Sequence, residues 1–223
     1  RCDRARAAAS RNAGVMAARE NVVLVHGLWM RALAMGALAR RLRDAGYAVS
    51  TFDYASVGRG PQPARQRLAD RIERLGGRVH LVGHSLGGLV ALETLREVDA
   101  HDGHVVCLGS PLRGSAAARR IGAWPIGRAL VGHSLDLLHE GVAGWHGRIP
   151  VGVIAGAAPY GLGMLLGQFG EPNDGTVAVS ETRLDGIADH LVVPSTHTGL
   201  IYNDAVAKQA AHFLAHGAFA KGW

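Results

Sequence analysis

Short apolar runs alternate with longer amphipathic stretches along most of the chain. The short runs are rich in β-branched residues, as is typical of buried strands. They cover residues 22–26, 48–52, 79–83, 104–108, 149–155 and 188–193. Helical patterns lie between or after them, at residues 31–45, 61–75, 86–98 and 200–216. This alternation predicts an α/β fold, in which a mostly parallel sheet of about six strands carries helices on both faces.

One junction between a predicted strand and a predicted helix carries a chemical motif. Gly83-His84-Ser85-Leu86-Gly87 follows an apolar run and precedes a helical pattern with an apolar face. In this setting Gly-x-Ser-x-Gly is the nucleophile elbow, a sharp turn that exposes a serine hydroxyl at the strand tip. Its two glycines are needed because a Cβ would clash with the neighbouring backbone. The motif therefore predicts Ser85 as a nucleophile.

A second Gly-His-Ser-Leu sequence, at residues 132–135, serves as an internal control. Asp136 stands where the elbow requires its second glycine, and no clear strand pattern precedes this copy. We therefore expect Ser134 to be an ordinary helix or loop residue.

A serine hydroxyl needs a base that accepts its proton. In hydrolases with the order Ser–Asp/Glu–His, the base lies on a loop after the last strand. His197 fits this position, because a turn at residues 194–196 separates it from the strand pattern at 188–193. His190, at the start of that strand, and His212, inside the final helix, are the late alternatives.

The base in turn needs an acid that orients it. Asp174 is our candidate, since it lies on the long loop beyond the predicted strand at 149–155 and precedes His197 in sequence. Asp-Gly also marks a turn, so an alternative interpretation is that Asp174 only helps to form that turn. The alternative acids are Glu171, Asp185 and Asp189.

A tetrahedral intermediate needs backbone N–H donors aimed at its oxyanion. Leu86 follows the nucleophile at a helix N-terminus, where the dipole favours negative charge. The second donor comes from a loop after an earlier strand, and Leu28 in His26-Gly27-Leu28-Trp29 is the candidate. We expect His26 to hold this loop in place by hydrogen bonding.

Four stretches together resemble the α/β-hydrolase superfamily, and specifically its small bacterial lipases. They are His26-Gly27-Leu28, Gly83-His84-Ser85-Leu86-Gly87-Gly88, Asn173-Asp174-Gly175 and His197-Thr198-Gly199-Leu200. A fifth, at residues 109–115, has Leu112 where these lipases often have a histidine. The resemblance spans about residues 21–216. It implies an α/β-hydrolase fold and a carboxylic-ester hydrolase with Ser85, Asp174 and His197 as its triad and no cofactor.

Some related lipases hold calcium near the catalytic histidine. No convergent acidic pair is visible at that place in this sequence, so we predict no metal site. The two cysteines, Cys2 and Cys107, are not expected to form a disulfide, because one lies in the N-terminal arm and the other in a predicted strand.

The net charge of +6 is concentrated toward the N-terminus. Residues 1–20 contribute +3 and lack the apolar core of a signal peptide, so we expect a disordered basic arm before a single domain at 21–223. No dense basic cluster is interleaved with aromatic residues, which argues against a nucleic-acid partner. With no signal peptide or transmembrane helix visible, a cytoplasmic location is favoured.

Residues 149–170 carry no charge and are long enough to span a bilayer. Two prolines and six glycines argue instead for a strand followed by an apolar loop near the active site. We expect this loop and the tip of the first strand to contact an acyl chain, although the same loop side chains could simply fill core. The predicted substrate contacts are Trp29, Leu165, Leu166 and Phe169.

The segment 112–148 lies between two predicted sheet strands and is predicted to be a short cap or lid-like insertion. One ordinary helix covering the sheet is the alternative. The sequence as a whole predicts a lipase-like ester hydrolase acting on apolar acyl esters, with transient contact to a lipid interface. A thioesterase or acyltransferase with the same triad, or a non-catalytic binding module on this fold, remains the alternative function.

Overall fold

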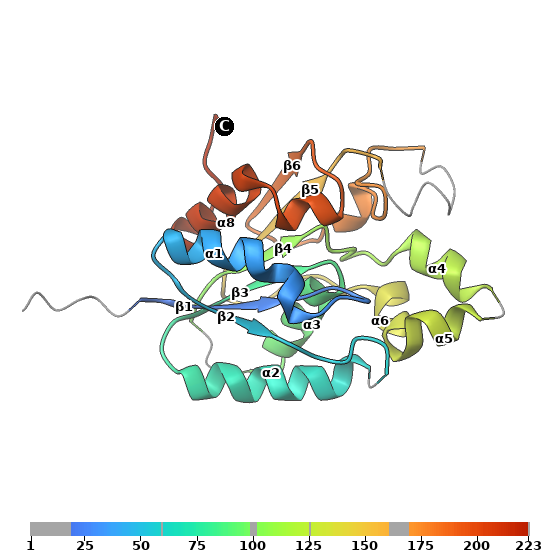
Figure 1. Ribbon diagram of the computed structural model, residues 1–223, viewed down its shortest axis with the longest axis horizontal. Coiled ribbons are helices and arrows are strands. Elements are labelled where there is room, and N and C mark those ends of the chain that lie inside the picture. The colour runs from blue at the N-terminus through green and yellow to red at the C-terminus, as the bar shows by residue number, and fades with distance from the viewer. Residues whose placement is uncertain (1–18, 59, 99–101, 125, 161–169, 223) are drawn as a thin grey trace, which may run out of the picture.

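The structure is a computed structural model that describes residues 19–58, 60–98, 102–124, 126–160 and 170–222. Six parallel strands form one sheet in the order β2-β1-β3-β4-β5-β6 (Figure 1). They are β1 (Asn21–Val25), β2 (Ala48–Phe52), β3 (Val79–His84), β4 (Val105–Leu108), β5 (Val151–Gly156) and β6 (Asp189–Val193). The predicted α/β fold and its strands are confirmed, with every strand end within two residues of its predicted position.

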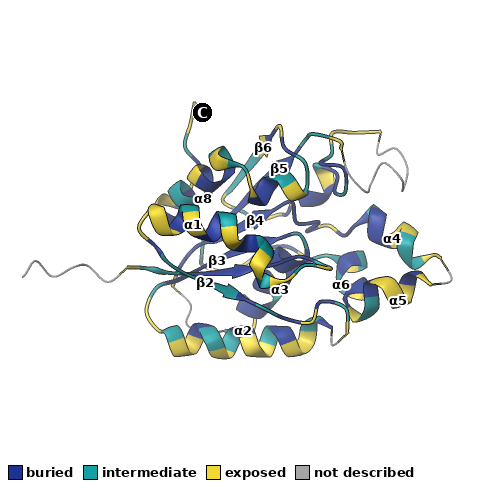
Figure 2. Cartoon of the chain, viewed as in Figure 1, coloured by how far each residue is buried: buried dark blue, intermediate teal, exposed yellow. Residues whose placement is uncertain are grey.

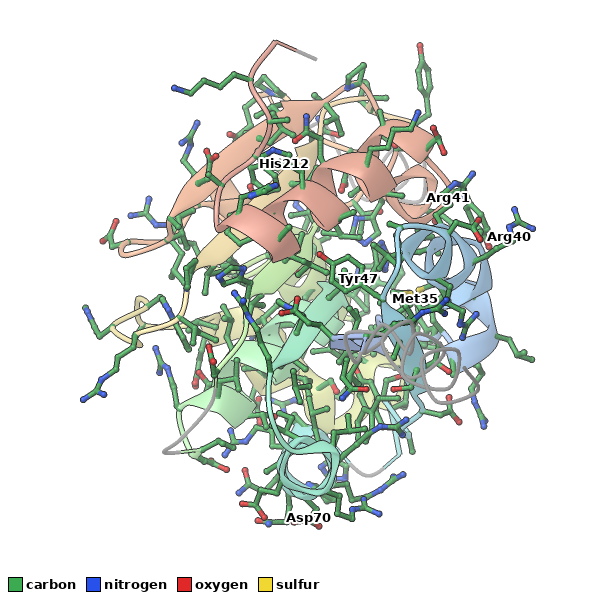
Figure 3. The ribbon with its side chains drawn as sticks, turned by 90° about the vertical axis from the view of Figure 1, so that its left-hand side faces the viewer. Met35, Arg40, Arg41, Tyr47, Asp70 and His212 are labelled. Carbon is green, nitrogen blue, oxygen red and sulfur yellow. The ribbon has the colours of Figure 1, made fainter. Side chains whose placement is uncertain are left out.

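Helices cover both faces of the sheet, which explains why its central strands read as continuous apolar runs. Alternate residues of β1 point to opposite faces: Val22 and Leu24 join one buried cluster, and Val23 and Val25 join the other. The first cluster packs under α1 (Gly36–Asp44) and α8 (Asp204–His216), and the second under α2 (Pro61–Leu75) and α3 (Leu86–Leu95). Figure 3 shows the two faces through Asp70 on α2 and His212 on α8, which lie on opposite sides.

Three predicted helices differ from the structure. The helix expected at 31–45 is a 3-10 turn, η1 (Ala32–Met35), followed by α1. The helix expected at 86–98 ends at Leu95 and is buried on nearly all sides, because the sheet covers one side of α3 and α2 covers another (Figure 2). The helix expected at 200–216 is a 3-10 turn, η4 (Thr198–Ile201), followed by α8. Asn203 separates them by capping α8, since its side chain accepts hydrogen bonds from the Ala205 and Val206 amides.

The segment 112–148 folds as several short helices beyond the carboxyl ends of the strands (Figure 1). Both predictions for this segment, a short cap and one helix covering the sheet, required helical structure. The described residues of the segment form several short helices and not one long helix. Its elements are α4 (Ala116–Gly122), α5 (Gly127–Val131), η2 (Gly132–Ser134) and α6 (Leu135–Glu140). Within the described ranges, no helix combines the length and the hydrophobicity needed to cross a membrane.

A histidine network closes the amino edge of the sheet. His80 in β3 donates through Nε2 to the Glu20 carboxylate at 3.1 Å, and its Nδ1 accepts the His104 amide at 3.1 Å. The His104 ring donates to the Leu214 carbonyl at 2.7 Å. Glu20, the last residue of the predicted N-terminal arm, is thus fixed to the sheet, while residues 1–18 lie outside the described part.

Candidate active site

Ser85 occupies a strained turn between β3 and α3. Its φ of +53° and ψ of −123° lie in a region that side chains other than glycine rarely adopt. The turn is fixed on both sides: the Ser85 amide donates to the Leu108 carbonyl at 2.9 Å, and the Ser85 carbonyl accepts the Gly88 amide at 3.1 Å. This conformation costs on the order of 1–3 kcal/mol and persists because the surrounding structure holds it.

The glycines of the motif permit the turn through close backbone contacts. A Cβ on Gly83 would lie 2.4 Å from the Gly88 nitrogen, and a Cβ on Gly87 would lie 2.2 Å from the Val25 carbonyl oxygen. No side chain fits at either distance, because the atoms it meets are backbone atoms that cannot move aside. The predicted elbow geometry is therefore present at residues 83–87.

Asp174 and His197 form a hydrogen-bonded pair. His197 Nδ1 donates to Asp174 Oδ2 at 2.7 Å, and the His197 amide donates to the Asp174 carbonyl at 2.8 Å. The other carboxylate oxygen accepts the Thr176 and Val177 amides at 2.9 and 2.7 Å. Asp174 is buried and its Cβ packs on Gly156, the last residue of β5, where an added Cβ would lie 2.7 Å away. These contacts fix the ring of His197 and leave its Nε2 available.

His197 and Ser85 line the same pocket. No hydrogen bond joins the Ser85 hydroxyl to His197 in the described part of the chain. Catalytic hydrogen bonds are often long before substrate binds, so the lack of a bond between Ser85 and His197 is compatible with a nucleophile and its base.

The other candidate bases and acids lie elsewhere. His190 in β6 is bonded to Thr182 at 2.8 Å, and His212 on α8 is bonded to the Ala218 carbonyl beyond that helix. The alternative acids are occupied or exposed, since Glu171 accepts the Ser180 hydroxyl, Asp189 accepts the Phe219 amide, and Asp185 is 89% exposed. Of the acids weighed from the sequence, Asp174 alone contacts His197.

His84 is a neighbour of the pair that the sequence analysis did not single out. Its Nε2 donates to the His197 carbonyl at 3.0 Å, and the two rings pack with centroids 4.7 Å apart. Complete burial lowers the pKa of His84 to about 3, so its ring stays neutral. The available signal was its place inside the Gly-x-Ser-x-Gly motif, which puts the residue before the nucleophile behind the active site.

The two predicted oxyanion donors, Leu28 and Leu86, lie in segments that adjoin Ser85. Leu86 is the first residue of α3, so its amide has no partner within the helix. Leu28 lies in the loop after β1 and lines the pocket. This loop packs directly on the nucleophile, because a Cβ on Gly27 would lie 3.1 Å from Ser85 Cβ.

His26 holds that loop in place by hydrogen bonding, as expected from the sequence. Its Nδ1 donates to the Gly27 carbonyl at 2.9 Å, its Nε2 accepts the Tyr54 amide at 3.3 Å, and its ring stacks on Tyr54 at 4.5 Å. Burial lowers the pKa of His26, although Asp53 nearby opposes the shift. Both ring nitrogens of His26 are therefore taken up by contacts that hold this loop.

The pocket has a volume of about 540 Å³ and mostly apolar walls. Of the predicted substrate contacts, Trp29 lines this pocket, whereas Leu165, Leu166 and Phe169 lie outside the described residues. The insertion supplies a wall that single residues in the sequence did not reveal, through Ile121, Trp124, Leu130, Val131 and Leu138.

In the described ranges, no three His, Cys, Asp or Glu side chains converge as a metal site would require. Cys107 is a free, buried thiol in β4, and burial raises its pKa to about 12.

Solved structures with a similar fold include several lipases. The mature form of the Bacillus licheniformis lipase BlEst2 is 21% identical, with a TM-score of 0.73 over 90% of this chain and 93% of that one. A monoacylglycerol lipase of Paleococcus ferrophilus is 19% identical, with a TM-score of 0.64 over 88% and 94% of the chains. The phospholipase PlaB of Legionella pneumophila, in complex with thio-NAD, is 18% identical, with a TM-score of 0.63 over 86% and 56%.

At these identities the likeness to solved structures concerns the fold. A search of curated proteins finds no match to the sequence. The model of the alpha/beta hydrolase family matches residues 22–218, which include the sheet, the elbow and the Asp174–His197 pair. The chain belongs to the alpha/beta hydrolase family.

Proposed function

We propose that the protein is a serine carboxylic-ester hydrolase that cleaves esters of apolar acyl chains through an acyl-enzyme. The observation that carries this proposal is the strained Ser85 turn beside the His197–Asp174 pair in one apolar pocket. Residues with strained backbone conformations cluster at active sites, where the strain holds a reactive group in position.

The mechanism follows from the groups around Ser85. His197 Nε2 takes the hydroxyl proton as Ser85 Oγ attacks the ester carbonyl carbon. The tetrahedral intermediate collapses, the C–O bond to the alcohol breaks, and the imidazolium returns the proton to the leaving oxygen. Water then attacks the acyl-enzyme with His197 as base, and the acid product leaves with Ser85 restored. Asp174 holds the Nδ1–H and stabilises the imidazolium.

The oxyanion would accept hydrogen bonds from the amides of Leu28 and Leu86. Leu86 lies at the N-terminus of α3, where the helix dipole favours developing negative charge. Loss of one such donor typically costs roughly 10²–10³ in kcat.

Apolar walls make an acyl chain the fitting substrate group. Burial stabilises each methylene by about 0.8 kcal/mol, so kcat/KM would rise up to about fourfold per carbon until the pocket is full. We assign the chain contacts to Trp29, Leu165, Leu166 and Phe169, together with the insertion wall.

The rim of the pocket fits a lipid interface. Trp124, Leu130 and Tyr160 line the pocket and are each more than two-fifths exposed. The segment 103–135 around two of them carries four arginines and no acidic residue. Exposed apolar side chains in a basic segment favour transient contact with an anionic lipid surface.

The decisive experiment pairs p-nitrophenyl esters from C2 to C16 with a serine-directed phosphonate. The phosphonate should label one site, Ser85, and Ser85→Ala should lower kcat at least about 10³-fold. Ser180→Ala, at a serine outside the pocket, should keep full activity. Labelling that maps to a peptide without Ser85 would reject the nucleophile. Best turnover of acetate, with no gain along the series, would reject the apolar substrate class.

A further inference from the structure

Trp29 has a backbone conformation that its side chain disfavours. Besides Ser85, it is the one non-glycine residue with positive φ in the described part of the chain, at +58°. The Met30 amide closes a turn on the Gly27 carbonyl at 3.4 Å, with Leu28 second and Trp29 third. Positive φ at the third position alone is the type II pattern, which ordinarily requires glycine or asparagine there. A tryptophan at this place needs contacts that hold it.

Two hydrogen bonds supply that restraint. The Trp29 amide donates to the Ser56 hydroxyl at 3.3 Å, which fixes the peptide between Leu28 and Trp29. The indole Nε1–H donates to the carbonyl of Leu130 in α5 at 2.7 Å. The turn that carries the proposed donor Leu28 is thereby tied to the insertion, 101 residues further along the chain.

A second link from the insertion ends on the same serine. Ser134 in η2 is fully buried and donates its hydroxyl to the Ser56 carbonyl at 2.5 Å. Ser56 therefore accepts Trp29 on one side and Ser134 on the other. The backbones also touch here, because a Cβ on Gly132 would lie 2.2 Å from the Val57 carbonyl oxygen.

We propose that Trp29 and Ser134 are positioning residues, through which the docked insertion holds the oxyanion turn in its active conformation. If these links are lost, Trp29 can relax to negative φ by rotation of the Leu28–Trp29 peptide. The turn then no longer holds the preceding Gly27–Leu28 peptide, whose N–H is the proposed oxyanion donor. The insertion then controls catalysis as well as lining the pocket. This inference rests on the proposed function, since it takes the Leu28 amide as an oxyanion donor.

The test uses p-nitrophenyl acetate, whose acyl group is too short to depend on the insertion wall. Trp29→Phe keeps an aromatic ring but loses the indole N–H, and Ser134→Ala removes the second link without touching the pocket. Each should lower kcat about tenfold and leave KM within about twofold. The double variant should lose less than the product of the two, because both changes release the same turn. Phosphonate should still label Ser85 in every variant, more slowly than in the wild type.

Trp145→Phe is the matched control. Its indole Nε1–H donates to the Ile149 carbonyl at 3.0 Å, and it does not line the pocket, so its loss should leave kcat for acetate unchanged. An equal loss of kcat in Trp145→Phe would overturn the proposal. A wild-type kcat in Ser134→Ala would also overturn the proposal. If Trp29→Phe does not fold, the kcat of Ser134→Ala alone tests the proposal. A Trp29→Phe defect confined to KM for long esters would show Trp29 to be a wall contact. Absence of Ser85 labelling in the wild type would instead reject the proposed function.

Discussion

Two histidine–carboxylate pairs lie at opposite edges of the sheet. At the carboxyl edge, His197 meets Asp174 at 2.7 Å, and at the amino edge, His80 meets Glu20 at 3.1 Å. Their exposures are inverted: the Asp174 side chain is 1% exposed and His197 13%, whereas Glu20 is 39% exposed and His80 0%. One pair turns its histidine toward a pocket and the other turns its acid toward solvent.

The two histidines also differ in which of their ring nitrogens are bonded. Both ring nitrogens of His80 are used, one by Glu20 and one by the His104 amide. His197 uses Nδ1 for Asp174, and in the described part of the chain its Nε2 has no hydrogen-bond partner. A histidine beside a carboxylate therefore becomes a base only where its second nitrogen reaches a pocket that also holds a nucleophile.

The largest expected effect is a difference in kcat between variants of the two pairs. Asp174→Asn should lower kcat by about 10³–10⁴, because the amide cannot hold the histidine in the required tautomer. Glu20→Gln should leave kcat within about twofold, since its partner His80 lies at the opposite edge of the sheet from Ser85. Steady-state kinetics on a p-nitrophenyl ester measures both. Full activity in Asp174→Asn, with loss in a Glu171 or Asp189 variant, would move the acid role.

Glycines at the two edges provide a second contrast. A Cβ on Gly109, at φ +54°, would lie 3.0 Å from Asp174 Oδ2 and 3.1 Å from His197 Nδ1. Gly109→Ala should therefore displace the pair and lower kcat roughly 10²-fold, as misplacement by about 1 Å does. Gly77, at φ +61°, has no atom within 4 Å of its Cβ position, so Gly77→Ala should leave kcat unchanged and cost about 1–2 kcal/mol of stability. Equal kinetics in both variants would contradict the proposed role of the pair.

Acid should destabilise both edges. Burial lowers the pKa values of His80 and His84 below that of an unfolded histidine, to about 3 for His84. The folded state excludes protons that the unfolded chain binds below about pH 6.5, so the free energy of unfolding should fall as pH drops through that value. Each such group contributes up to about 1.4 kcal/mol per pH unit. Urea unfolding between pH 8 and pH 4 measures this, and a flat profile would contradict the buried, neutral state of these rings.

The smallest effect should come from the amino-edge pair itself. Glu20→Gln should lower the free energy of unfolding by about 1 kcal/mol, because Glu20 is more than a third exposed and solvent screens its bond to His80. Thermal unfolding with Asp44→Asn as an exposed control would resolve this. A loss of several kcal/mol would mean that the amino edge depends on this pair far more than its exposure indicates.

Local sequence patterns predicted most of the fold and part of the candidate site. Parallel strands covered on both faces must be continuously apolar, so all six were visible in the sequence. The elbow and the His197–Asp174 pair were also predictable, because strand ends at one edge of a parallel sheet bring distant residues together. The all-round burial of α3 was not, since its periodicity alone does not reveal that α2 covers its outer side.

Contacts between distant loops left no local signal. The Ser134 hydroxyl and the His84 ring each bond a carbonyl far away in sequence, at Ser56 and His197. The motif places His84 behind the active site but does not reveal that its ring bonds the His197 carbonyl. The neighbours of Ser134 do not distinguish it from a solvent-facing residue. The same holds for Ile121 and Val131, whose place in the pocket wall depends on how the short helices of the insertion pack.

The anchoring of Asp174 has a consequence for how this enzyme class can diversify. Its Cβ rests on the end of β5, its carboxylate on two amides that follow it, and its carbonyl on His197. None of these restraints comes from residues 157–172, the stretch in which we expect acyl-chain contacts. Doubling the length of such a loop costs only about 0.6 kcal/mol in closure entropy. We therefore expect that changes of length or sequence within this stretch alter the substrate range, by evolution or by design, while the Asp174–His197 pair keeps its geometry.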